Sequence, residues 1–374
     1  MQCAPGRELI RQAFSHTEGE RIPVFDVANN PQLFRETLGY DNRWSDGAAA
    51  VSCAKELGLD AAMVPAGSYT GLIKREREWE GDTFFRDRFG VGYRVSGTSW
   101  PLGIAVDEVP LNLEFAERFP RMAVIRESDI APVREGIAAA HSNDSDEIAL
   151  FAGVRSGFSH LTISGGLVAL SMLIYEDPDL LHELVRLSTE YWTETGLRLI
   201  EAGADALYVA NDMGMNGATL ISPEHLREFF LPEFFRQCET WKRAGGRVIL
   251  HSCGNIMAVL PDLAAGGYID GINNLQSHAG MDIAAVKRAY GAIWTLIGNV
   301  DATTVMTSER REDIDEALVS LIRRAGHGGG LILATDHSFH MGIPTVNVRH
   351  FIRQAKFFGS GEQRSILVQQ AGKE

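Results

Sequence analysis

The stretch Asp205–Asn255 reads DALYVANDMGMNGATLISPEHLREFFLPEFFRQCETWKRAGGRVILHSCGN, and it decides the fold. Its two ends, residues 205–212 and 247–255, carry short runs of aliphatic and β-branched residues, which are typical of buried strands. Residues 222–246 begin at a Ser-Pro pair and end at a Gly pair, which predicts one or two helices. Two buried strands joined by a helix indicate a parallel sheet covered on both faces.

This alternation of strand and helix occurs about eight times in the 374 residues, which favours a closed α/β architecture, the (β/α)8 TIM barrel, over an open sheet. No G-x-G-x-x-G follows the first predicted strand and no Walker pattern is present, so the dinucleotide and P-loop classes lose support. We expect one barrel domain over residues 1–374. Predicted strands lie within residues 21–30, 44–67, 147–154, 205–212, 247–255, 270–276, 293–301 and 330–338.

One segment in the N-terminal third departs from this rhythm. Residues 74–110 alternate charged with aromatic or aliphatic residues and contain several glycines. Period-two alternation with glycine at the turns is typical of antiparallel hairpins. We therefore predict a small hairpin insertion at about residues 74–110.

Composition narrows the class of partner. The chain has 35 Lys and Arg against 49 Asp and Glu, a net charge of -14, and its basic residues are scattered. This balance favours neither nucleic acid nor an anionic membrane surface. The longest apolar segment, residues 160–178, is interrupted by Gly165-Gly166, so we expect a buried helix. The first twenty residues do not resemble a signal peptide, and the four cysteines show no disulfide spacing, so we expect a cytoplasmic protein with free thiols.

In a barrel of this kind, the carboxyl ends of the strands carry the chemistry. We expect substrate-binding roles for Asp26, Asn211, Gln276, Asn299 and Asp301, and catalytic or orienting roles for Asp212 and Asp336. Polar residues at these ends can also simply satisfy loop backbone groups. The polar residues that follow the predicted strands are Asp26, Arg155, Ser156, Asn211, Asp212, His251, Cys253, Asn273, Asn274, Gln276, His278, Asn299, Asp301, Asp336, His337 and His340.

His251 and Cys253 are the most specific pair in this set. Two residues apart on an extended segment, their side chains lie on the same face. Three interpretations remain open: packing, a thiol activated by a neighbouring histidine, or two ligands of one zinc ion. For zinc, a third ligand must come from another strand, and His337 is the best placed by residue type.

Several blocks resemble the uroporphyrinogen decarboxylase superfamily: residues 205–234, GGRVILHSCGNI, AGMDIAAVKRAYG, LIGNVD and GGLILATDHSFHMGIPTVNVRHFI. The true decarboxylases carry an arginine-rich motif after the first strand and an essential aspartate after the second. The corresponding stretches here, PVFDVANNPQLFRE and AAMVPAGSYTG, contain neither. The departures put porphyrinogen decarboxylation in doubt.

The other branch of this superfamily consists of methyltransferases that act with methylcorrinoid proteins, in which His-x-Cys and a later cysteine hold zinc. The resemblance implies zinc at His251 and Cys253, with His337 about where the later cysteine falls; Asp336 or His340 are alternatives. It also implies methyl transfer between a corrinoid (methylcobamide) and a thiol such as coenzyme M, or tetrahydrofolate. The chain has no Asp-x-His-x-x-Gly corrinoid motif, so the corrinoid is expected on a separate protein.

Two other functions stay open. A decarboxylase or lyase acting on a polycarboxylate needs several cations at the barrel mouth, and the sequence offers only Arg155 and Arg35 there. A barrel that only binds a small molecule or a corrinoid protein is the second alternative. Metal content separates the zinc enzyme from both.

Overall fold

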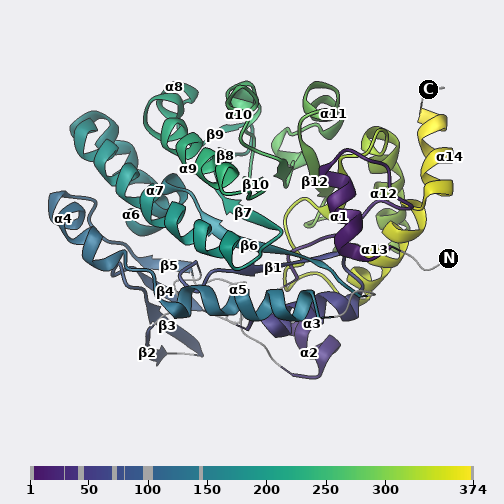
Figure 1. Ribbon diagram of the computed structural model, residues 1–374, viewed down its shortest axis with the longest axis horizontal. Coiled ribbons are helices and arrows are strands. Elements are labelled where there is room, and N and C mark those ends of the chain that lie inside the picture. Colours follow the sequence, from purple (N-terminus) through teal and green to yellow (C-terminus); the bar gives the residue numbers. More distant parts are fainter. Residues whose placement is uncertain are drawn as a thin grey trace.

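The computed structural model of the protein describes residues 4–28, 30–40, 46–69, 74–79, 81–95, 104–142 and 146–371. Seven parallel strands form one curled sheet in the order β1-β6-β7-β10-β11-β12-β13 (Figure 1). Each of these strands is buried along almost its whole length, as expected for strands with helices outside and side chains packed inside. The strands are β1 (Ala61–Pro65), β6 (Ala149–Arg155), β7 (Ala206–Ala210), β10 (Val248–His251), β11 (Gly271–Asn273), β12 (Thr295–Val300) and β13 (Leu331–Thr335).

An irregular segment around Val24 takes the eighth position. Val24 forms a parallel bridge with Leu333 of β13, and on its other side its carbonyl accepts the N–H of Asp60 at 2.8 Å, directly before β1. The prediction of a TIM barrel is thereby confirmed. The strand predicted at residues 21–30 is reduced to isolated bridges because Pro23 has no N–H and Asp60 Oδ2 accepts the N–H of Val24 at 2.7 Å.

Helices follow the strands and cover the outer face of the sheet (Figure 1). Their ends follow local rules: Asp177 caps the helix that begins at Pro178, and Gly58, with φ 85°, ends the helix before β1. The helices are α1 (Gly6–Phe14), α2 (Pro31–Leu38), α3 (Gly47–Leu57), α4 (Leu113–Met122), α5 (Glu127–Ala140), α6 (Gly157–Glu176), α7 (Pro178–Glu201), α8 (Pro223–His225), α9 (Leu231–Arg243), α10 (Leu260–Gly266), α11 (Ile283–Tyr290), α12 (Arg311–Ala325), α13 (Thr345–Phe358) and α14 (Gly361–Ala371).

The predicted helical region 222–246 divides into three pieces. A π-helical turn, Leu226–Phe230, separates α8 from α9. Pro232 lies in the first turn of α9 and cannot donate a backbone hydrogen bond, so the preceding turn widens there.

Helix α6 corresponds to the long apolar segment. Among the described helices it alone has the length and composition to cross a membrane, with a mean hydropathy of 1.5, and 61% of its apolar window is buried. It packs along α7, and Gly166, with φ 80° and ψ 153°, interrupts its helical geometry. These features fit the buried core helix that the sequence predicts.

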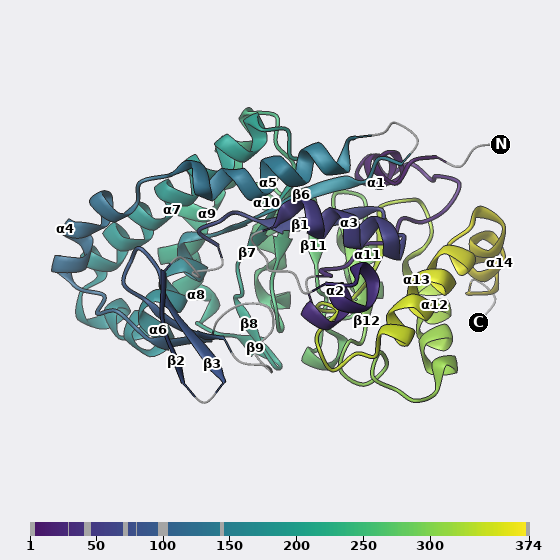
Figure 2. The ribbon, with the colours of Figure 1, turned by 90° about the horizontal axis from the view of Figure 1, so that it is seen from below.

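The predicted insertion is confirmed as a four-stranded antiparallel sheet that follows the carboxyl end of β1. Figures 1 and 2 show it set apart from the barrel strands. Its strands are β2 (Lys74–Trp79), β3 (Asp82–Arg86), β4 (Gly92–Val95) and β5 (Ile104–Asp107). A second, two-stranded ribbon, β8 (Gly214–Met215) and β9 (Ala218–Thr219), follows β7.

The cysteine assignments agree with expectation for the described residues. Cys53, Cys238 and Cys253 are free thiols, the first two buried in α3 and α9. Cys3 lies outside the described residues.

Candidate metal centre

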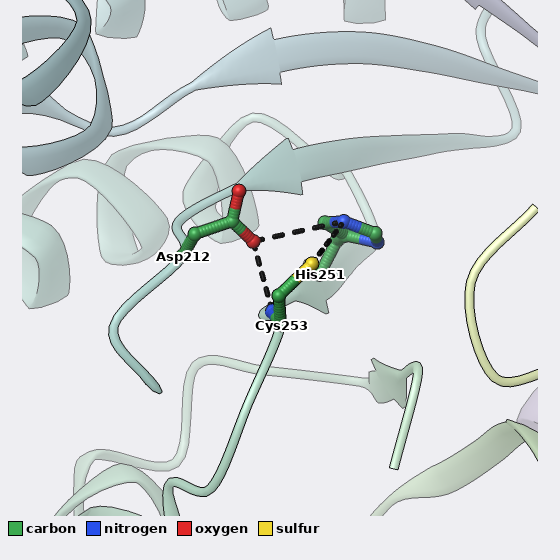
Figure 3. A group of neighbouring side chains, drawn as sticks. All are labelled: Asp212, His251 and Cys253. Carbon is green, nitrogen blue, oxygen red and sulfur yellow. Dashed lines mark hydrogen bonds and ion pairs between the residues drawn. The ribbon is translucent and has the colours of Figure 1, made fainter. Parts of the chain in front are cut away.

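The carboxyl ends of β7 and β10 bring together the side chains of Asp212, His251 and Cys253 (Figure 3). His251 Nε2 lies 3.8 Å from Cys253 Sγ and 3.7 Å from Asp212 Oδ1. One ligand atom from each residue lies within 4.8 Å of the other two. The His-x-Cys pair therefore lies on one face, as its spacing predicts, and the near third member is Asp212.

Two side chains accept hydrogen bonds from backbone N–H groups and so fix the loop that carries Cys253. Asp212 Oδ1 accepts the N–H of Cys253 at 2.8 Å, and Gln276 Oε1 accepts the N–H of Gly254 at 2.6 Å. Gly254 has φ 74°, and a Cβ there would lie 2.2 Å from the carbonyl carbon of Gly214. Only glycine fits this approach, so the residue after the thiol is fixed by backbone geometry.

Two neighbours orient the ring of His251 through its Nδ1 atom. The hydroxyl of Tyr208 lies 2.5 Å and Asn273 Oδ1 lies 2.8 Å from Nδ1. Tyr208 also donates to Asn273 Oδ1, and burial raises its pKa, so the hydroxyl keeps its proton. With the proton on Nδ1, the lone pair on Nε2 is directed toward Cys253. This is the tautomer that a metal ligand needs.

Asn274 contacts both His251 and Cys253. Its Nδ2 donates to Cys253 Sγ at 3.3 Å and lies 3.4 Å from His251 Nε2. It is fully buried, has φ 89°, and its Oδ1 has no hydrogen-bond partner among the described residues. Burial, and next the charge of Asp212, raise the pKa of the Cys253 thiol above its usual range. A bound cation would reverse this effect and favour the thiolate.

His337 lies outside this close group. Its ring centroid is 6.1 Å from that of His251, and its Nδ1 lies 2.7 Å from Ser338 Oγ. Burial, and next the charge of His251, lower its pKa to about 4, so its ring is neutral at neutral pH. His340, the alternative ligand, uses both ring nitrogens: Nε2 lies 3.1 Å from the carbonyl of Ala302 and Nδ1 accepts from Gly342.

The predicted substrate-binding residues are bound to nearby protein groups at the strand ends. Asp26 accepts the N–H groups of Val27 and Thr335, each at 2.8 Å, and burial raises its pKa to about 7. Asn211 Oδ1 accepts from Ser156 Oγ at 2.7 Å, and Asn299 Nδ2 donates to the carbonyl of Leu275 at 2.8 Å. Asp301 and Asp336 lie in a second group with His278.

The two cations suggested for a polycarboxylate have different surroundings. Arg155 is buried, donates to the carbonyl of Tyr69 at 2.8 Å and lies 4.1 Å above the Tyr69 ring. Arg35 is exposed on α2. They therefore do not form the buried cationic pair that such a substrate would require.

The group at His251 fits zinc by donor type and spacing. Nitrogen, thiolate sulfur and carboxylate oxygen are the ligands that zinc uses in proteins. With zinc bonds of about 2.0–2.3 Å, tetrahedral geometry separates neighbouring ligand atoms by about 3.4–3.6 Å. The observed 3.7 and 3.8 Å are close to these values, so small side-chain movements suffice to bind the ion.

Sequence reasoning did not assign Tyr208, Asn273 and Asn274 to the site. Tyr208 is a polar-tipped residue inside an otherwise aliphatic strand, which is the signal that could have identified it. The sequence identifies Asn273 and Asn274 only as polar residues that follow a predicted strand. The contacts that give them a role depend on the positive φ of Asn274, which the sequence does not display.

The barrel and this group of side chains define a TIM barrel with a candidate metal centre at its mouth. The uroporphyrinogen decarboxylase (URO-D) family profile matches residues 96–357, and the chain belongs to this family.

The relatives include both a methyltransferase and a decarboxylase. The methylcobamide:CoM methyltransferase MtaA of Methanosarcina barkeri is 22% identical over 262 residues, covering 69% of each chain. A uroporphyrinogen decarboxylase of Anaeromyxobacter dehalogenans is 25% identical over 241 residues, covering 63% of this chain and 66% of the relative.

Solved structures show the shared fold. A methyltransferase from Methanosarcina mazei superposes with a TM-score of 0.67 at 17% identity, over 95% of this chain and 99% of that one. A B12-independent methionine synthase from Shewanella sp. W3-18-1 gives 0.51 at 12% identity, over 93% and 97%.

Proposed function

We propose that the protein is a zinc-dependent methyltransferase that moves a methyl group between a corrinoid on a separate protein and a thiol or tetrahydrofolate acceptor. The observation that carries this proposal is the convergence of His251 Nε2 and Cys253 Sγ on one point beside Asp212. The likeness to a methylcobamide:CoM methyltransferase supports the same choice within the family. The cytoplasm, where Cys253 stays reduced, is the compartment that suits this chemistry.

Some residues of the proposed centre bind the metal and others orient the residues that bind it. His251, Cys253 and Asp212 are the proposed protein ligands, and His337 faces the same region with a neutral ring that can complete the set. When bound, zinc makes a thiol or similar acceptor nucleophilic near neutral pH. Tyr208 and Asn273 hold Nδ1 of His251, and Asn274 donates to Sγ of Cys253, so the ligand atoms are aimed before any ion arrives.

Methyl transfer from cobalt to an acceptor thiol needs no further reactant. The acceptor thiol loses its proton to solvent and its sulfur forms a bond to the methyl carbon. The cobalt–carbon bond breaks, and its electron pair stays on cobalt, which changes from cobalt(III) to cobalt(I). Of the two aspartates expected to act in catalysis, Asp212 lies beside His251 and is a proposed ligand, whereas Asp336 lies in the second group.

Metal content combined with a demethylation assay tests the proposal. Purified protein should contain about one zinc at this centre and should demethylate methylcobalamin, seen as a cobalt spectral change, only with both metal and a suitable acceptor present. Cys253→Ala should remove the metal and the activity while the fold remains, because the thiol lies at the mouth rather than in the core.

Cys53→Ala, the same chemical change in the buried α3 thiol, is the matched control and should keep both properties. Full zinc occupancy in Cys253→Ala would remove this residue from the centre. If zinc-loaded protein fails to demethylate methylcobalamin with every thiol and folate acceptor tried, the choice returns to a decarboxylase or a binding barrel.

A further inference from the structure

A second group of ligand-type side chains lies at the ends of the next three strands. His278 lies in the short 3-10 turn Ser277–Ala279 after β11, Asp301 directly follows β12, and Asp336 directly follows β13. One ligand atom from each lies within 4.8 Å of the other two. None of the three belongs to the group around His251.

Each carboxylate uses one oxygen for the backbone and turns the other toward His278. Asp301 Oδ1 accepts the N–H groups of Thr303 and Thr304, each at 2.7 Å, and Asp336 Oδ1 accepts the N–H of Ala302 at 2.9 Å. The remaining oxygens, Asp301 Oδ2 and Asp336 Oδ2, lie 3.8 and 3.5 Å from His278 Nδ1. The turn after β12 therefore holds both carboxylates in place.

These separations suit an ion better than hydrogen bonds. An N–H···O hydrogen bond spans about 2.7–3.2 Å, so both contacts are too long. Ligands of a tetrahedral ion with bonds of about 2.0–2.2 Å lie about 3.3–3.6 Å apart, close to the observed values. A protonated His278 offers only one proton at Nδ1, which cannot satisfy two oxygens at these distances.

Asp336 gives an independent reason to expect a cation. Its side chain is 1% exposed, and its Oδ2 has no hydrogen-bond partner among the described residues. A buried carboxylate oxygen without a donor is costly, and a cation bound to it removes that cost.

We propose that His278, Asp301 and Asp336 bind a second divalent cation of the zinc class. One nitrogen and two carboxylate oxygens are a donor set that zinc accepts, and the exposed side of His278 leaves the remaining position open to solvent. This site does not depend on methyl transfer and does not share a ligand with the centre at His251.

Cobalt(II) titration of the metal-free protein distinguishes the two sites, because only the first contains a thiolate and therefore gives thiolate-to-cobalt charge-transfer absorption. Wild-type protein should bind two equivalents. Cys253→Ala should bind one equivalent without that absorption, and His278→Ala should bind one equivalent with it. Exposed His182 on α7 provides the matched control, and His182→Ala should bind two.

Asp301→Asn gives a second variant whose side chain keeps its shape, and it should also lose one equivalent. Binding of one equivalent with the thiolate absorption by wild-type protein would overturn the second site and leave the proposed methyltransferase centre intact. Two equivalents in both His278→Ala and Asp301→Asn would exclude these residues as ligands. Two equivalents bound by wild-type protein without the thiolate absorption would count against the first centre and not the second.

Discussion

The hydroxyl of Tyr208 lies 2.5 Å from Nδ1 of His251, on the side of the ring opposite the atom that faces Cys253. A buried tyrosine on β7 thereby sets the orientation of a histidine on the adjacent strand β10. The candidate ligand atom is aimed by a residue that does not itself reach the metal position.

Tyr208→Phe should weaken zinc binding by roughly 10–100-fold, the usual scale for partners that orient a metal-bound histidine. The ring still fills its place in the barrel, so the free energy of unfolding of the metal-free protein should change little. Competition with a chromophoric chelator measures the affinity. Tyr93→Phe, which removes a hydroxyl bonded to Asp87 in the inserted sheet, is the control. Equal affinities in Tyr208→Phe and wild type would show that Asn273 alone orients the ring.

Asp212→Asn should lower the rate of methyl transfer per folded molecule by roughly 10–100-fold. The amide keeps the shape and can still accept the N–H of Cys253, but it loses the charge beside His251. Methylcobalamin demethylation at saturating zinc gives the rate. Asp262→Asn, which disrupts an ion pair with Arg227, should leave it unchanged. A variant with reduced stability but the wild-type rate would limit Asp212 to its loop hydrogen bond.

The buried His160 should make stability depend on pH. Burial, and next the charge of Arg155, lower its pKa to about 3, against about 6.5 in the unfolded chain. Between these values the unfolded state binds a proton that the folded state does not. This stabilisation is therefore complete above pH 6.5 and is lost as the pH falls toward 3. From pH 6.5 to 4.5 the loss should be about 2–3 kcal/mol.

Urea unfolding at several pH values measures this effect, with His160→Gln as the variant that cannot titrate but can still bond Ser188. The exposed His182→Gln should keep the wild-type pH profile. Parallel profiles for wild type and His160→Gln would show that another group governs the acid side.

Limited proteolysis should cut first in residues 74–97 or in residues 138–147, where the sequence is rich in polar residues. The two arginines of β2, Arg75 and Arg77, are exposed and offer trypsin sites. The products should remain associated, because we propose that residues 1–374 form a single barrel. Two fragments that separate and each refold alone would contradict the single domain.

Periodicity predicted the barrel because short apolar runs, which form the buried strands, alternate with helical segments along the chain. It also predicted the insertion, where the period changes to two. It failed at residues 21–30, where Pro23 and the side chain of Asp60 replace the strand ladder. It also left α2, α4, α5 and α14 unassigned.

For the site, spacing on one strand was enough to pair His251 with Cys253, because alternate residues of an extended chain share a face. The sequence could not identify which residue lies nearest as the third possible ligand. His337 has the right residue type, but the loop after β7 places Asp212 nearer, and that choice depends on a hydrogen bond to the backbone of Cys253. Zinc ligation by His337 stays a prediction.

The bridge between Val24 and Leu333 has a consequence for how the chain folds during its synthesis. The hydrogen bond from Thr335 to Asp26 joins residues 309 positions apart, so this seam closes a very long loop and depends on few backbone bonds. The ribosome releases β1, β6 and β7 long before β13, so these strands can pair as an open sheet. We expect the barrel to close last, with the amides of Phe25 and Leu333 gaining protection from hydrogen exchange later than those of β6 and β7.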